Sequence, residues 1–146
     1  MKAAILYDRD FAEWTARTAT LLRERRFDEA DVEHVAEEIE DMGKRDRREV
    51  SNRLKVLIAH LLKWTAQPDR RDGSTWSATI DEQRSELDEI FDQSPSLRRY
   101  AEQDMARIYG RAVKLASRET GLEPSVFPQE CPYPLDQLLD INYLPR

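Results

Sequence analysis

The sequence predicts an all-α fold: a helical bundle of about five helices with a proline-rich C-terminal strap and a short terminal helix. Three observations favour it. Apolar residues recur at helical spacing from Val32 to Met42 and again from Val50 to Trp64, as they do on one face of a helix. Only four glycines occur in 146 residues, too few for a fold rich in tight strand turns. Four prolines lie within 122–134, where they exclude a long helix.

Two predicted helices precede Gly43. The first begins near Asp8 or Asp10, whose carboxylates can cap free backbone N–H groups. Its apolar stripe comprises Phe11, Trp14, Thr18, Leu21 and Leu22. The second helix follows Asp28 or Asp31. Its predicted core face comprises Val32, Val35, Ala36, Ile39 and Met42.

Gly43 leaves two alternatives open. It can end the second helix, because glycine readily adopts the left-handed conformation common at helix C-termini. It can also lie inside one continuous helix, since Gly43 and Asp46 project to the same side as Ile39 and Val50. The following segment, to about Thr65, is apolar around most of its circumference, which is typical of a central helix in a bundle.

Proline, glycine and polar residues indicate where the remaining helices begin and end. A polar loop over 67–74 precedes a fourth helix. Ser94-Pro95 ends that helix and opens a fifth, which stops at Gly121. The strap and a short helix over 135–140 complete the chain. We expect a single domain spanning 1–146.

The candidate functional residues are the polar side chains of the second and third helices. His60 lies at the edge of the apolar sector, on the same side as Arg53. A buried contact from either residue to Glu38 or Glu40 would satisfy polar atoms that a core does not leave unpaired. We therefore interpret Glu38, Arg53 and His60 as a structural polar network, with a functional site as the alternative.

A metal site is a second hypothesis. His34, Glu37 and Asp41 have spacings of three, four and seven, which places them together on the helix face opposite Ile39. They would present an imidazole and two carboxylates to one metal ion, and the protein would then be a small metal-dependent enzyme. His60 with Glu38, on the third and second helices, is the other histidine and carboxylate set that could serve such an enzyme. The competing interpretation is a solvated acidic face, which needs no cofactor.

Two basic clusters raise the question of nucleic acid. Their members are Arg45, Arg47, Arg48, Arg70 and Arg71. Acidic residues interrupt both clusters, and the formal net charge is −6. Phosphate binding requires cations that neighbouring anions do not offset. The sequence therefore argues against a nucleic-acid partner.

The apolar runs and the cysteine content indicate where the protein is located. No apolar run approaches the roughly 20 residues that span a bilayer, and the N-terminus lacks the apolar stretch of a secretory signal. The single cysteine, Cys131, cannot form an internal disulfide. We expect a cytoplasmic protein with no membrane partner.

Several phrases resemble a bacterial family catalogued as domain of unknown function 29. They are YDRDFAEWT, AEEIEDMG, HLLKW, WSATIDEQR, SPSLR, ETGL and FPQECPY, in this order. The resemblance implies a compact all-helical domain of bacterial or cyanobacterial type, with Glu37–Gly43 and His60–Trp64 as its signature. It implies no activity and no role for any residue.

The leading functional hypothesis is an interaction module. No recognisable catalytic set occurs in the sequence, whereas several aromatic side chains could be exposed. Such a module would bind a protein partner, or a second copy of itself, through an amphipathic helical surface.

Overall fold

The structure is a computed structural model that describes residues 2–146, with side-chain burial described from Leu6 onward. Within that range every regular element is a helix, so the predicted all-α fold is confirmed. The chain divides into two compact units, Met1–Arg45 and Asp46–Arg146. The single domain expected over 1–146 stays a prediction.

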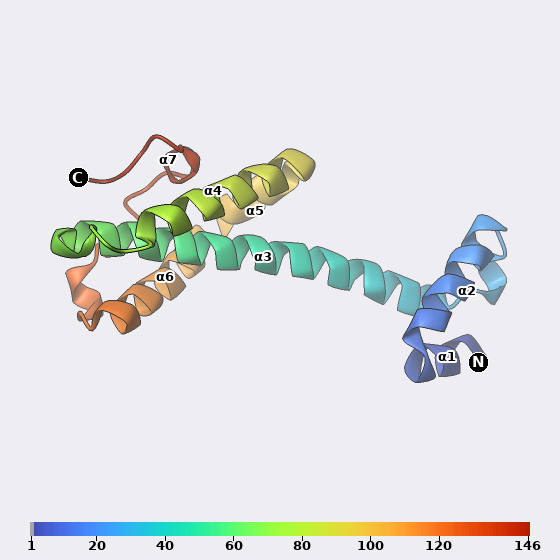
Figure 1. The fold of residues 1–146 in the computed structure, drawn as a ribbon. Coiled ribbons are helices and arrows are strands. Elements are labelled where there is room, and N and C mark those ends of the chain that lie inside the picture. Colours follow the sequence, from blue (N-terminus) through green and yellow to red (C-terminus); the bar gives the residue numbers. More distant parts are fainter. Residues whose placement is uncertain (1) are drawn as a thin grey trace. The chain divides into compact units, whose positions relative to one another are not determined.

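The N-terminal unit, drawn in blue shades in Figure 1, contains three helices and the beginning of a fourth. These are α1 (Lys2–Arg9), α2 (Phe11–Arg23), η1 (Phe27–Glu29) and the first part of α3 (Val32–Ala66). The Asp10 carboxylate accepts the Glu13 N–H at 3.0 Å, which confirms the predicted cap of α2. Helix α1 was not predicted. Its eight residues are too few to display a helical period of their own.

Helix α3 is continuous from Val32 to Ala66 and contains 35 residues. Of the two alternatives at Gly43, the continuous helix is therefore confirmed. The polypeptide does not reverse direction between the two predicted segments, which become two parts of one helix.

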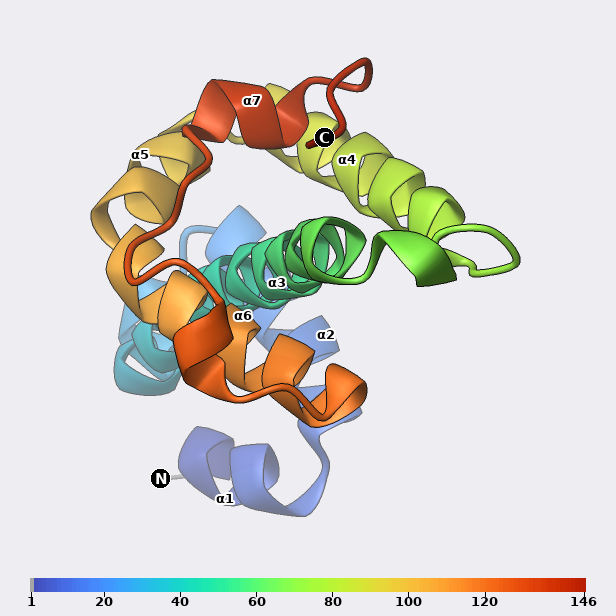
Figure 2. The same cartoon turned by 90° about the vertical axis from the view of Figure 1, so that its left-hand side faces the viewer.

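In the C-terminal unit the other helices pack around the second part of α3. Both views place α3 between α4 and α6, and α7 lies against α4 (Figures 1 and 2). Its elements are η2 (Pro68–Arg70), α4 (Trp76–Gln93), α5 (Ser96–Gln103), α6 (Met105–Thr120), η3 (Pro124–Val126) and α7 (Leu135–Leu139). Gly121 ends α6 with a φ of 77°, the left-handed conformation expected of a glycine stop.

The predicted fifth helix is two helices, α5 and α6, that meet at Asp104. The Asp104 carboxylate accepts hydrogen bonds from the Tyr100 hydroxyl at 3.2 Å and the Arg107 guanidinium at 2.7 Å. Aspartate favours helix ends because its side chain competes for local hydrogen-bond donors. Here the carboxylate binds side chains one turn away on either side and does not cap α6, so these bonds accompany the break without explaining it.

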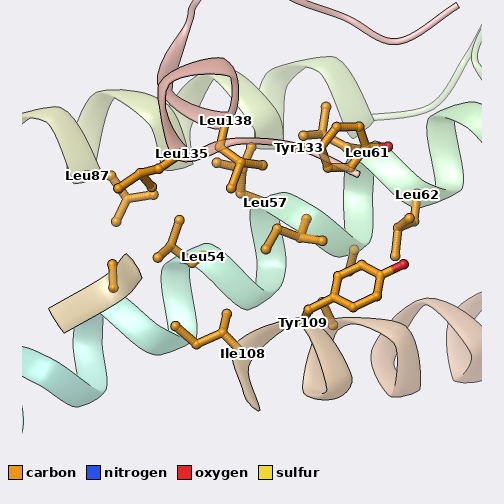
Figure 3. Close-up of a cluster of buried hydrophobic side chains, with 14 of the residues drawn as sticks. Leu54, Leu57, Leu61, Leu62, Leu87, Ile108, Tyr109, Tyr133, Leu135 and Leu138 are labelled. Atoms are coloured by element: carbon orange, nitrogen blue, oxygen red, sulfur yellow. The ribbon is translucent and has the colours of Figure 1, made fainter. Parts of the chain in front are cut away.

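The core of the C-terminal unit forms around α3. Figure 3 shows Leu54, Leu57 and Leu61 of α3 between side chains of α4 and α7 on one side and of α6 on the other. The predicted core residues Leu54, Leu57, Leu61, Ile80 and Leu87 are all fully buried. Trp64 was expected among them and is only partly buried; the guanidinium of Arg71 lies over its ring, 4.9 Å from the centroid.

A buried arginine fixes the C-terminal segment. Arg84 is 1% exposed, and its guanidinium donates to the carbonyl oxygens of Leu138 and Tyr143, both at 2.7 Å, and of Gln137 at 3.4 Å. Burial lowers the pKa of Arg84. Its three acceptors are backbone carbonyls: Leu138 lies in the last turn of α7, Gln137 also accepts the Asp140 N–H, and Tyr143 follows the helix. The guanidinium therefore ties α7 and the C-terminal tail to α4.

We expect Leu57→Ala to lower the free energy of unfolding by about 2–5 kcal/mol, because Leu57 is fully buried and its loss leaves a cavity. Ile39→Ala on the same helix is the control: Ile39 is 59% exposed, so its effect should stay within about 0.5 kcal/mol. Urea unfolding followed by circular dichroism measures both. Equal losses would contradict this assignment of core and surface.

We expect Arg84→Met to cost at least about 2 kcal/mol, because it leaves buried carbonyl oxygens without donors. It should also speed proteolysis within residues 135–146. Arg98→Met is the control, since Arg98 also bonds to α7, through Asp136, but both partners are exposed. Limited proteolysis and urea unfolding would compare the two. Similar behaviour of both variants would show that Arg84 does not hold α7.

Candidate functional site

An aromatic and histidine cluster joins α1 and α2 to the first part of α3. The Tyr7 ring stacks on the His34 imidazole with centroids 3.9 Å apart, and the Trp14 ring meets the imidazole edge-on at 6.5 Å. The Tyr7 hydroxyl donates to the Glu38 carboxylate at 2.6 Å. These contacts place the α1–α2 segment on the side of α3 that carries His34 and Glu38.

Ionisable groups in this cluster influence each other. His34 Nδ1 pairs with the Asp31 carboxylate, which also accepts the His34 backbone N–H at 3.3 Å. This pairing raises the pKa of His34 and lowers the pKa of Asp31. The hydrogen bond to Glu38 raises the pKa of Tyr7 to about 12. At neutral pH, Tyr7 is therefore a hydrogen-bond donor and Asp31 an acceptor.

The predicted core face of this part of α3 is wrong. Val32, Ile39 and Met42 are 60%, 59% and 52% exposed. The reason is that Tyr7 and Trp14 contact the polar side of the helix, so the apolar side faces away from α1 and α2. We call the four exposed apolar residues on this side the open stripe: Val32, Ala36, Ile39 and Met42.

The predicted metal ligands are not gathered into a site. His34 is bonded to Asp31, a residue outside the predicted set, and Glu37 is exposed. Within residues 2–146, no group of three or more His, Cys, Asp or Glu side chains is placed to hold a metal ion. The arrangement of His34, Glu37 and Asp41 therefore does not reproduce the set of three ligands that their spacing suggested.

The predicted network of Glu38, Arg53 and His60 is replaced by separate contacts. Arg53 donates to Glu49 at 3.0 Å and to Gln83 at 3.2 Å, and His60 Nδ1 bonds to its own helix at the Val56 carbonyl, 2.8 Å away. A contact from Glu38 to either residue required the chain to reverse direction between them, and α3 continues as a helix there. Glu38 bonds to Tyr7 instead.

His60 and its neighbour Lys63 form a second polar group, in the C-terminal unit. Lys63 is 4% exposed, donates to Glu119 at 2.9 Å and lies over the Trp76 ring at 5.4 Å. Burial, aided by the Lys63 charge, lowers the pKa of His60. These contacts neutralise a buried cation, and they join α3 to α4 and α6.

Sequence reasoning did not identify three of these side chains: Tyr7, Lys63 and Arg84. Arg84 has a usable signal, because it shares helical spacing with Ile80 and Leu87, both of which are buried. A charged residue at such a position indicates a buried hydrogen-bonding role. Lys63 follows two leucines in a helix that is apolar nearly all round, and it carries the same signal.

An apolar pocket of about 260 Å³ lies between the end of α3 and the strap. Its lining includes Leu62, Ala66, Phe127, Pro132, Tyr133 and Pro145. This volume is below the range of about 300–1,000 Å³ typical of small-molecule sites. The lining also offers few polar groups to orient a ligand, so the pocket does not supply a chemical site.

Of the arginines in the two basic clusters, one packs against the fold and others are exposed beside acidic residues. Arg71 stacks on Trp64 and donates to its carbonyl at 2.7 Å, so it serves the fold. Arg45, Arg47 and Arg48 are exposed, with Asp46 and Glu49 among them. The alternation of sign matches the expectation of a solvated helix surface.

A family model described as "Domain of unknown function DUF29" matches residues 6–144. The chain belongs to this family. The DUF29 match covers nearly all of the described chain and confirms the resemblance drawn from the sequence phrases. No curated protein and no solved structure matches the chain.

The two phrases that the resemblance singled out both lie in α3. Glu37–Gly43 contains Glu38, which binds Tyr7, and two members of the open stripe, Ile39 and Met42. His60–Trp64 contains the buried Lys63. No helix within residues 2–146 combines the length and apolar character that crossing a bilayer requires.

The two histidines should titrate on opposite sides of the ordinary histidine pKa of about 6.5. Asp31 raises the pKa of His34, and burial lowers that of His60. NMR titration of the imidazole Cε1 protons would resolve both. Asp31→Asn should lower the His34 pKa and leave that of His60 unchanged. A His34 pKa that does not respond to this substitution would contradict the pairing.

The same shifts determine how the Asp31–His34 pair affects stability. Because the folded pKa of His34 is raised, its contribution is complete below about pH 6.5 and is lost as the pH rises through the folded value. Because the folded pKa of Asp31 is lowered, its contribution is lost as the pH falls through that value. The pair therefore stabilises the fold most between the ordinary pKa of an aspartate, 3.8, and that of a histidine, 6.5.

Proposed function

We propose that the chain is an interaction module that docks a protein partner on the open stripe of α3. The observation that carries this proposal is the exposure of Val32, Ile39 and Met42, each more than half accessible on one side of one helix. Their spacings of seven and three match those by which an amphipathic helix presents anchors to a partner. Isolated exposed leucines or valines are ordinary, whereas an aligned set indicates a contact surface.

The energetics favour docking at this position. Burying one large aliphatic side chain contributes about 1.5–3 kcal/mol, so the burial of all three would contribute several kcal/mol to the free energy of association, before the costs of binding. The stripe lies on a formed helix, which the contacts of Tyr7 and Trp14 with His34 hold against α1 and α2. A partner therefore does not have to order this side of the interface, which reduces the entropic cost of association.

The class of partner follows from charge and composition. The surroundings of the stripe are acidic, which argues against nucleic acid as the ligand. A protein partner, or a second copy of the chain, remains. The single cysteine and the family resemblance support a place of action in the cytoplasm of a bacterium.

The test is photo-crosslinking in cells that naturally produce the chain, with a photoreactive phenylalanine analogue at Ile39 or Met42. We expect one discrete adduct, whose mass distinguishes a different protein from a second copy. Glu37 is the matched control, because it is exposed on the same helix and lies about 160° around the axis from Ile39. Equal adducts from Glu37, or no adduct from Ile39 and Met42, would contradict the proposal.

A further inference from the structure

We infer that the occupant of the open stripe is a helix with an apolar face bordered by lysine or arginine, contributed by a different protein. This inference rests on the proposed function and adds the chemistry of the partner. It comes from the charges that border the stripe and from the length of the stripe.

The borders of the open stripe are acidic. Residues 31–42 contain six acidic residues and no lysine or arginine. At about 100° per residue, Glu40 lies beside the stripe on one border and Glu38 on the other, with Ile39 between them. Glu33 continues the first border toward the N-terminus of α3, and it is exposed, as is Glu40. The first border therefore presents two exposed carboxylates to whatever covers the stripe, and the second presents the half-buried carboxylate of Glu38, which also binds Tyr7.

A second copy of the chain fits these borders poorly. Two open stripes in contact, whether parallel or antiparallel, would bring two copies of residues 31–42 together. Every charged pair across that interface would be acid against acid, because the segment has no lysine or arginine. Like charges facing each other across a helix interface are destabilising and select against that pairing.

The length of the stripe also argues against self-pairing. From Val32 to Met42 it extends for ten residue steps, or about 15 Å along the helix axis. Stable coiled coils need about three or four heptads of apolar a and d positions. Beyond Gly43 the charged residues Lys44, Arg45 and Arg47 end the apolar pattern. The stripe thus suits docking of a short helical segment.

A basic amphipathic helix fits both observations. Its apolar residues would pack on Ile39 and its neighbours, and flanking cations would lie against Glu33, Glu38 and Glu40. Glu38 already accepts one hydrogen bond from Tyr7, and a carboxylate has acceptor sites for further donors. Opposite charges along the rim of an interface accelerate association and select the partner.

The experiment uses the full chain and two labelled synthetic peptides of 21 residues, about three heptads. Both peptides carry leucine at a and d; one has lysine and the other glutamate at e and g. Fluorescence anisotropy should detect binding of the lysine peptide only, with affinity that falls as salt is added. Ile39→Asp should weaken this binding at least about tenfold, since it removes a buried aliphatic contact.

A charge-reversal pair supplies the matched control. Glu40→Lys should weaken binding of the lysine peptide about threefold or more, whereas Glu37→Lys, with the same change of charge on the far side of α3, should not. Circular dichroism and urea unfolding check that each variant retains the fold. Equal effects of the two reversals would overturn the assignment of the borders.

The remaining outcomes separate this inference from the proposed function. Binding of the glutamate peptide, or of neither peptide, would overturn the basic partner, while crosslinking from Ile39 would still support docking on the stripe. Sedimentation that shows a dimer disrupted by Ile39→Asp would identify a second copy as the occupant. Binding of the lysine peptide that Ile39→Asp leaves unchanged, together with no crosslink from Ile39, would overturn both proposals.

Discussion

The structure depends on α3 continuing as one helix through Gly43. A glycine inside a helix costs about 1 kcal/mol relative to alanine, a small term beside the burial of several leucines further along the same helix. Continuity has two consequences. The second part of α3 becomes the centre of the C-terminal core, where Leu54, Leu57 and Leu61 are fully buried. The first part contacts side chains of α1 and α2, and these helices cover one side of it.

Periodicity was sufficient to predict the second part of α3 and α4, because these helices are long and their apolar residues lie on definite faces. Leu57, Ile80 and Leu87 were placed correctly in the core. Two local features of this unit were not predicted. The expected fifth helix is divided into α5 and α6 at Asp104, and no period in the sequence reports this break. Arg84 is buried because backbone carbonyls of the α7 segment need donors, a requirement that appears only in three dimensions.

The candidate site was predicted in part. Helical spacing correctly grouped His34 and Asp41 on one face of α3, and Ile39 on the other. It could not say which face would be covered, because periodicity identifies an apolar side and assumes that the same chain buries it. The assumption failed for Val32, Ile39 and Met42. The network of Glu38, Arg53 and His60 failed for a related reason, since it presupposed a turn at Gly43 that α3 does not make.

The contact chosen by α1 and α2 has a physical rationale. Tyr7 presents both an aromatic ring, which stacks on His34, and a hydroxyl, which donates to Glu38. A leucine or valine on the open stripe offers no partner for that hydroxyl, and an unpaired buried hydroxyl costs about 1–3 kcal/mol. The polar side of α3 therefore suits this amphipathic tyrosine better than the apolar side does. The side left exposed is the one whose burial would release the most free energy on docking, and this is the physical basis for proposing a partner there.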